Sequence, residues 1–241
     1  MKKLIKKFLS SLGIFFTKNQ KYDSITVAIL KKFLKPSSNV IDVGCHEGEF
    51  MDETLRWAPQ GTHVAVEPLP YLASKLREKY KNKNVKVFNL ALSDSSGESP
   101  FVHVEDAPAY SGLKIRKYPS FVKKIKSLTI KTDTLDHILH GLPCPDLVKI
   151  DVEGAEWAVL KGATATLKYC KPLIIFECGK GAADKYGTSP EKFWNWVKHY
   201  GYNIYTLKSF LNQKQPLGLS EFSQLFHTGS EYYFIARYEK N

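Results

Sequence analysis

The sequence contains few of the residues and motifs that mark several common classes of protein. Its four cysteines, Cys45, Cys144, Cys170 and Cys178, form no C-x-x-C pair, which argues against a zinc site. Cysteines at such wide spacing predict buried free thiols in a reducing compartment, and therefore a cytoplasmic location. The chain also has no G-x-S-x-G elbow, no Walker loop and no H-E-x-x-H helix, so those enzyme classes have no support.

Acidic residues are also scarce relative to basic ones. The chain has 24 acidic and 35 basic residues among 241, which gives a net charge of +11. This charge suits an anionic partner such as nucleic acid, a phosphorylated glycan or an acidic membrane surface. No aromatic-rich RNA-binding motif and no ordered basic stripe accompany it, which disfavours nucleic acid. The length predicts one ordinary domain with at most a short appendage.

The first eighteen residues, MKKLIKKFLSSLGIFFTK, have the pattern of a basic amphipathic helix. Apolar residues recur at three- and four-residue spacing, with lysines between them. No small-residue cleavage site follows, and the segment is too short to span a bilayer. Two interpretations stay open, a helix that packs on the domain and an anchor on an anionic membrane surface. The predicted organisation is this helix over residues 1–20 and one domain over residues 21–241.

Beyond this segment, short apolar runs alternate with amphipathic ones. This alternation predicts a doubly wound, mostly parallel α/β sheet with helices on both faces. Only a loop-rich stretch separates the last two strands, so we expect them to pair in antiparallel fashion. Strands are predicted over residues 39–45, 62–68, 85–92, 100–106, 146–152, 172–179, 203–209 and 231–238, and helices over 49–58, 70–82, 155–167 and 189–200.

The stretch VIDVGCHEGEF, residues 40–50, lies where the first strand turns into the first helix. Gly44 and Gly48 form a G-x-x-x-G pattern without the middle glycine of the dinucleotide fingerprint, which argues against NAD. Glu67 closes the next strand, where nucleotide-binding folds place an acid on the ribose hydroxyls. Together these residues suggest S-adenosylmethionine. The alternative is that the glycines only make a tight turn and that Glu67 caps the following helix.

Three segments carry a family resemblance. They resemble the FkbM family of S-adenosylmethionine-dependent methyltransferases and have the sequences IKTDTLDHIL, DLVKIDVEGAEWAVLKGA and KPLIIFECG. A fourth segment, NLALSDSSG, is similar to the third-strand block of that family. The resemblance covers residues 40–179. It implies a Rossmann-like methyltransferase sheet and methyl transfer to oxygen. The implied acceptor is a hydroxyl of a sugar, a glycan or a natural product.

The resemblance also implies roles for individual residues. The cofactor's methionine end would lie against the first turn, with Glu67 on the ribose and the third strand beside the adenine. Asp151 would be the base beside the reacting methyl group or a ligand of the methionine ammonium. Glu153 is the next candidate base, or a helix cap. The implied cofactor-binding residues are Asp42, Gly44, Cys45, His46, Gly48, Glu67, Ala91, Leu92, Ser93 and Asp151, and the implied catalytic ones are Asp151 and Glu153.

Other interpretations stay open at this stage. Asp151 and Glu177 end neighbouring strands, where catechol-type methyltransferases place ligands of Mg²⁺, but the resemblance requires no metal and we assign no metal ligand. The rival functions are an RNA or protein methyltransferase of the same fold and a non-catalytic nucleic-acid- or membrane-binding module. The asparagine-proline-proline-aromatic tetrad of many N-methyltransferases is absent. Asp151-Val152-Glu153-Gly154 occupies its place, which favours oxygen as the acceptor.

Overall fold

A computed structural model of the chain describes residues 17–239. The predicted N-terminal helix lies outside this range except for its last residues, so its two interpretations stay predictions. The described part begins with α2 (Lys18–Phe33), which Thr17 and Gln20 open with a capping box. Tyr22, Ile29 and Leu30 of α2 are buried. Within residues 17–239, no helix is long and apolar enough to cross a membrane.

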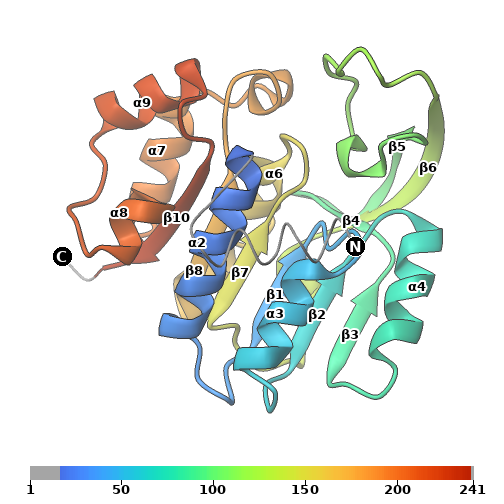
Figure 1. The fold of residues 1–241 in the computed structure, drawn as a ribbon, viewed down its shortest axis with the longest axis horizontal. Helices are drawn as coiled ribbons and strands as arrows, with labels where there is room; N and C mark the ends of the chain where they lie inside the picture. The colour runs from blue at the N-terminus through green and yellow to red at the C-terminus, as the bar shows by residue number, and fades with distance from the viewer. Residues whose placement is uncertain (1–16, 240–241) are drawn as a thin grey trace.

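A seven-stranded sheet forms the centre of the molecule (Figure 1). Its strand order is β3-β2-β1-β7-β8-β10-β9. The first five strands in this order are parallel, and β10 is antiparallel to both β8 and β9. The predicted doubly wound fold and its antiparallel carboxy-terminal pair are therefore confirmed. The bounds are β1 (Val40–Val43), β2 (His63–Val66), β3 (Val85–Phe88), β7 (Leu147–Ile150), β8 (Leu173–Glu177), β9 (Tyr202–Thr206) and β10 (Tyr233–Tyr238).

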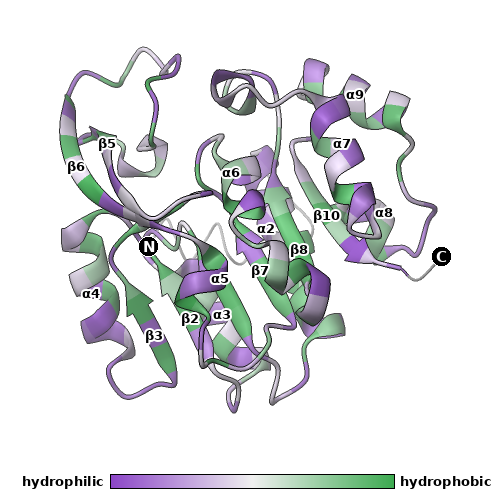
Figure 2. Cartoon of the chain, turned by 180° about the vertical axis from the view of Figure 1, so that it is seen from behind, coloured by the Kyte–Doolittle hydropathy of each residue, from purple (hydrophilic) through white to green (hydrophobic). Residues whose placement is uncertain are grey.

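Helices cover both faces of this sheet because its strands are apolar on both sides. Side chains of α2 pack with one face, and Figure 1 shows α2 and α3 in front of the strands. Phe193 of α7 and Phe222 of α9 pack with the other face, and Figure 2 shows α5 in front of the sheet on that side. The remaining bounds are α3 (Glu49–Trp57), α4 (Pro70–Tyr80), α5 (Leu135–Ile138), α6 (Glu156–Lys161), α7 (Pro190–His199), α8 (Leu207–Leu211) and α9 (Leu219–Thr228), with short helical turns at Pro108–Tyr110, Thr166–Cys170 and Ala183–Tyr186.

A second sheet of three strands lies beside the first, in the order β4-β6-β5. Its strands are β4 (Ala91–Leu92), β5 (Gly97–Val104) and β6 (Ile125–Asp133). The strand predicted over residues 85–92 is therefore wrong as one element, since its ends belong to different sheets. The Asn89 side-chain amide donates to the backbone carbonyls of Glu67 and Pro68, both at 2.9 Å. These bonds hold Asn89, which lies between β3 and β4, against the end of β2.

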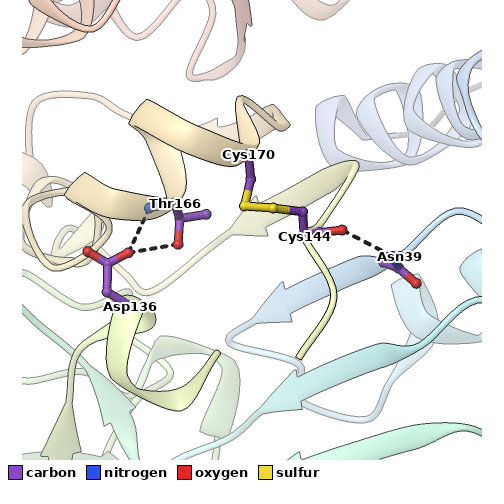
Figure 3. Close-up of a disulfide and its surroundings, with 5 residues drawn as sticks. All are labelled: Asn39, Asp136, Cys144, Thr166 and Cys170. Atoms are coloured by element: carbon purple, nitrogen blue, oxygen red, sulfur yellow. Dashed lines mark hydrogen bonds between the residues drawn. A yellow bond between two sulfur atoms is a disulfide. The ribbon is translucent and has the colours of Figure 1, made fainter. Parts of the chain in front are cut away.

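The cysteine prediction is wrong for two of the four residues. Cys144 and Cys170 form a disulfide with a Cα–Cα distance of 5.3 Å, whereas Cys45 and Cys178 are free and buried. β7 and β8 are neighbours, so the segments that lead into them lie together, and the disulfide joins these segments (Figure 3). A reducing compartment was inferred from free thiols. The cysteines therefore no longer support a cytoplasmic location.

Candidate active site

A pocket of about 580 Å³, open mouth included, lies over the carboxyl ends of β1, β2 and β7. This is where ligands bind in doubly wound sheets. The second sheet closes one side of the pocket with Leu92 and Phe101, and Leu69 and Leu90 add to this apolar wall. Acidic side chains from the ends of β2 and β7 line another part, namely Glu67, Asp151 and Glu153. The pocket therefore has an apolar part and an anionic part.

The predicted site residues divide into two groups. Seven of them line the pocket: Gly44, His46, Glu67, Ala91, Leu92, Asp151 and Glu153. The other four, Asp42, Cys45, Gly48 and Ser93, do not line it. Cys45 is buried against Met51 and Tyr80, and the Ser93 amide donates to Asp133 O. These four residues therefore contact other parts of the protein rather than the pocket.

Glu67 is held in place by the backbone around it. Its carboxylate accepts the amide N–H groups of His46 and Leu69, both at 2.9 Å. Only 4% of the residue is exposed. Burial raises the pKa of Glu67 to about 7, although the two hydrogen bonds oppose this. The carboxylate thus connects the first turn to the end of β2 and still faces the pocket.

The two glycines of the first turn are required by packing. Gly44 has a φ of +81°, and a Cβ atom there would lie 1.9 Å from the backbone oxygen of Asp151. Gly48 has a φ of +82°, and a Cβ atom would lie 2.3 Å from the Tyr80 hydroxyl. Any side chain at either position would clash as well as strain the backbone. The G-x-x-x-G pattern therefore reflects close packing, whatever ligand the turn also contacts.

A buried ion-pair chain lies beneath the pocket floor. Lys149 Nζ is 3.3 Å from Asp42 Oδ1 and 3.4 Å from Asp151 Oδ2. Asp42 is fully buried and lies opposite Lys149 in the β1–β7 register. Burial lowers the pKa of Lys149, but the two carboxylates together raise it above its ordinary value. Asp42 thus helps to keep Lys149 charged beside Asp151 without lining the pocket itself.

Asp151 is held in its ionised form. Lys149 lies beside it, and the Tyr233 hydroxyl donates a hydrogen bond to Oδ2. Burial alone would raise the pKa of Asp151, but these partners lower it below its ordinary value. A low pKa makes Asp151 a weak base and a good partner for a cation.

Glu153 has the opposite electrostatic setting. Burial and the neighbouring Asp151 charge raise its pKa to about 8, although its ion pair with Arg116 opposes the shift. Its backbone has a φ of +60°, in the left-handed region that few non-glycine residues adopt. Glu156 supports this turn by accepting the amides of Val152 and Gly154 at 3.0 and 3.1 Å. Glu156, not Glu153, therefore bonds the backbone of the turn that leads into α6.

A further carboxyl group lies next to Asp151 in the sheet. Ile150 pairs with Phe176, so Glu177 follows as the neighbour of Asp151 across β7 and β8. Burial and the nearby carboxylates raise the pKa of Glu177 well above its ordinary value. Sequence reasoning named Glu177 as a possible metal ligand. Among residues 17–239, no group of three or more histidine, cysteine or acidic residues is arranged to hold a metal ion.

Sequence reasoning missed three contacts around these acids. Lys149 interrupts the apolar run of β7, and this was the only available signal for the ion-pair chain. Tyr233 comes from β10 and Arg116 from the connection between β5 and β6. Neither residue lies in a motif, and only the tertiary fold brings them to the end of β7.

Comparison with known proteins identifies the family. A model of the FkbM methyltransferase domain matches residues 42–204, more than half of the chain. The chain belongs to the FkbM methyltransferase family. The resemblance of the sequence motifs to this family is thereby confirmed.

Two curated methyltransferases are similar to this FkbM-family chain. The 2-O-methyltransferase NoeI of Sinorhizobium fredii (strain NBRC 101917 / NGR234) is 28% identical over 146 residues, which cover 55% of this chain and 60% of NoeI. Methyltransferase sdnD of Sordaria araneosa is 31% identical over 153 residues, covering 51% of this chain and 59% of sdnD. The matches thus span at most about three fifths of either relative.

A solved structure in the same family shares the fold. The crystal structure of methyltransferase FkbM from Methylobacillus flagellatus KT superposes with a TM-score of 0.52 at 16% identity. The match covers 85% of this chain and 44% of that one. At this identity the likeness concerns the fold alone.

Proposed function

We propose that the chain is an S-adenosylmethionine-dependent O-methyltransferase that acts on a hydroxyl of a sugar, a glycan or a natural product. The observation that carries the proposal is the Glu67 carboxylate, fixed by two backbone amides at the rim of the pocket. A carboxylate has about four lone-pair positions, so two remain for the ribose hydroxyls. Family membership supports the same activity.

The pocket residues fit the parts of S-adenosylmethionine. Apolar side chains such as Leu92 and Phe101 suit the adenine, and Glu67 suits the ribose. The ionised Asp151 suits the positive charges of the methionine end. Within this proposal Ala91 and Leu92 contact the adenine, and Gly44 and His46 lie beside the methionine part. The cofactor supplies a methyl group on a good sulfonium leaving group.

The protein's own task is then positioning and proton removal. Asp151 is proposed to hold a cationic group of the cofactor, because Lys149 and Tyr233 lower its pKa and keep it ionised. Glu153 titrates near pH 8, which suits a base that works near neutral pH. We therefore favour Glu153 over Asp151 as the base that accepts the hydroxyl proton. The family resemblance requires no metal, so the proposal does not include Mg²⁺.

Oxygen is the proposed acceptor atom for two reasons. The relative from S. fredii is named a 2-O-methyltransferase. In addition, Asp151-Val152-Glu153-Gly154 occupies the position of the tetrad that many N-methyltransferases use. An assay with methyl-labelled S-adenosylmethionine tests the proposal. Label should enter hydroxyl acceptors from a panel of sugars and natural products. Label in RNA or protein would favour the rival methyltransferases, and a chain that neither binds the cofactor nor transfers label would be a non-catalytic module.

The N-terminal segment is proposed as a contact with an anionic membrane surface. Thr17 and Lys18 belong to the start of α2, where the Lys18 ammonium group donates to Gly229 O at 2.8 Å. Because Thr17 and Lys18 are part of the folded domain, the proposed membrane anchor is limited to residues 1–16. These residues contain the lysines and apolar residues of the amphipathic pattern. A peripheral membrane location follows from this proposal, while a cytoplasmic location needs evidence other than the cysteines.

A further inference from the structure

A strongly basic segment, residues 114–126, comprises the end of the connection between β5 and β6 and the first two residues of β6, and we call it the basic arm. Its sequence KIRKYPSFVKKIK has six cationic residues and no acidic one. Figure 1 shows this connection extending away from the central sheet, beside β5 and β6. Such a concentration of one charge at a projecting position favours contact with an anionic partner.

Half of these cations are free to bind something else. Lys114 donates to Lys185 O at 3.2 Å, Arg116 pairs with Glu153, and Lys126 pairs with Glu105 at 2.5 Å. The side chains of the other three, Lys117, Lys123 and Lys124, are exposed and have no hydrogen-bond or ion-pair partner within residues 17–239. These three side chains therefore carry positive charge into the solvent, although the Asp106 carboxylate accepts the backbone amides of Lys123 and Lys124 and Glu105 lies near Lys124.

Large apolar side chains are exposed on the same arm. Ile115 is 71% exposed, Phe121 57% and Ile125 47%. They are three of the six large hydrophobic residues that are exposed in the described part of the chain. Exposed apolar side chains gathered in one short segment mark a contact surface. Apolar side chains among free lysines are the composition of a segment that lies at a lipid headgroup layer.

The basic arm is continuous with the pocket. Ser111, Gly112 and Leu113 line the pocket and lead directly into the arm. Arg116 then reaches back to Glu153 at the end of β7. A surface that binds the arm would therefore lie beside the mouth of the pocket.

We propose that the basic arm docks on an anionic lipid bilayer, with Lys117, Lys123 and Lys124 on the headgroups and Ile115, Phe121 and Ile125 in the interfacial layer. Single-stranded nucleic acid fits the arm less well, because it needs aromatic faces on which bases stack. Arg116 already lies over the Tyr110 and Tyr118 rings, at 5.2 and 6.0 Å, and Phe121 packs edge-on against Tyr110. The two isoleucines offer no stacking surface.

The test is flotation of the full chain with vesicles of phosphatidylcholine mixed with phosphatidylserine, compared with pure phosphatidylcholine vesicles. The parent should float only with the anionic vesicles. Replacing Lys117, Lys123 and Lys124 together by glutamine should weaken the partition by about fivefold for each lysine, roughly a hundredfold in all. Phe121→Ser should weaken it at high ionic strength too, because an apolar contact is not screened by salt.

A matched control removes the same charge elsewhere. The control lysines are exposed and lie between the end of α4 and the first residues of β3, away from the pocket: Lys81, which pairs with Glu78, Lys83 and Lys86. Their triple replacement by glutamine should leave flotation close to that of the parent. All variants should bind S-adenosylmethionine alike, which separates this test from the proposed activity. The inference is overturned if the arm variant floats like the parent, if both triple variants lose flotation equally, or if the arm variant loses only RNA binding.

Discussion

Replacing Glu67 by glutamine keeps the side-chain shape and removes the charge at the position proposed to bind the ribose. In the parent, the two carboxylate oxygens each accept one backbone amide, from His46 and from Leu69. Glutamine retains one acceptor oxygen and turns an NH₂ group toward the other amide. The alanine variant is a poorer test, because it leaves both amides without this acceptor and costs about 1–3 kcal/mol of stability for each buried one.

The expected loss in cofactor binding is about 1–3 kcal/mol, the contribution of a charge-assisted pair of hydrogen bonds. This corresponds to a dissociation constant roughly 5- to 150-fold higher. Calorimetric titration with S-adenosylmethionine measures it directly. Glu47→Gln is the matched control, because Glu47 lies on the same turn, is exposed and does not line the pocket. It should bind as the parent does.

The pH dependence gives a second readout of the same residue. Burial raises the pKa of Glu67 from its ordinary 4.5 to about 7. The folded chain therefore favours the protonated form, so the contribution of Glu67 to folding stability is full below pH 4.5 and is lost as the pH rises through about 7. Cofactor binding should change in the opposite direction, since the ionised form accepts the ribose hydroxyls. Parent affinity should fall as the pH drops below 7, and Glu67→Gln should lack this part of the dependence. A glutamine variant with parental affinity and parental pH dependence would refute the ribose assignment.

Four further predictions follow from the described contacts. Because Asp151 is proposed to hold a cationic group of the cofactor, Asp151→Asn should weaken cofactor binding by about 1–3 kcal/mol in calorimetric titration, and parental affinity would remove it from the binding site. Glu153→Gln should lower turnover by about a hundredfold or more and remove a pH–rate limb near 8 in steady-state kinetics over a pH series, and an unchanged limb would exclude it as the base. Cys144→Ser should lower the free energy of unfolding by about 2–4 kcal/mol in chemical denaturation, and the same loss should follow reduction of the parent; equal stability of parent and variant under oxidising conditions would show that the disulfide does not form. Deleting residues 1–16 should reduce flotation with anionic vesicles and leave cofactor affinity unchanged, whereas a lower melting temperature with parental flotation would favour packing of this segment on the domain.

Much of the sheet could be predicted because its signals are local. Buried parallel strands are continuous apolar runs, and the helices between them begin at visible caps such as Ser189 and Pro190 of α7. The local sequence does not show that residues 85–92 are divided between two sheets. It depends on Asn89, whose amide bonds the end of β2, and on pairing between β4 and β6. Periodicity cannot show either contact.

Two other features were not predicted from the sequence, the helix α9 and the disulfide, and the reasons differ. α9 lies in a stretch that was predicted as a loop, although Phe222 and Phe226 recur at helical spacing and Glu221 closes a capping arrangement with Gly218. These residues therefore indicate a helix from the sequence itself. The disulfide between Cys144 and Cys170 had no sequence signal, because its partners become neighbours only when β7 and β8 pair.

The site was predictable where the topology alone determines the position. Glu67 and Asp151 line the pocket because they follow strands whose carboxyl ends meet at one edge of the sheet. The roles of Asp42 and Gly48 were harder to assign, since both are conspicuous in the sequence and neither lines the pocket. Asp42 pairs with Lys149, and Gly48 makes room for Tyr80. A motif thus locates a site more reliably than it identifies which of its residues contact the ligand.

Calorimetric titration of the parent chain with S-adenosylmethionine tests the central claim most directly. We expect binding to a single site with a dissociation constant on the order of micromolar. Glu67→Gln should weaken this binding, and Glu47→Gln should leave it unchanged. A parent chain that remains folded and shows no heat of binding at any accessible cofactor concentration would contradict the assignment of the pocket.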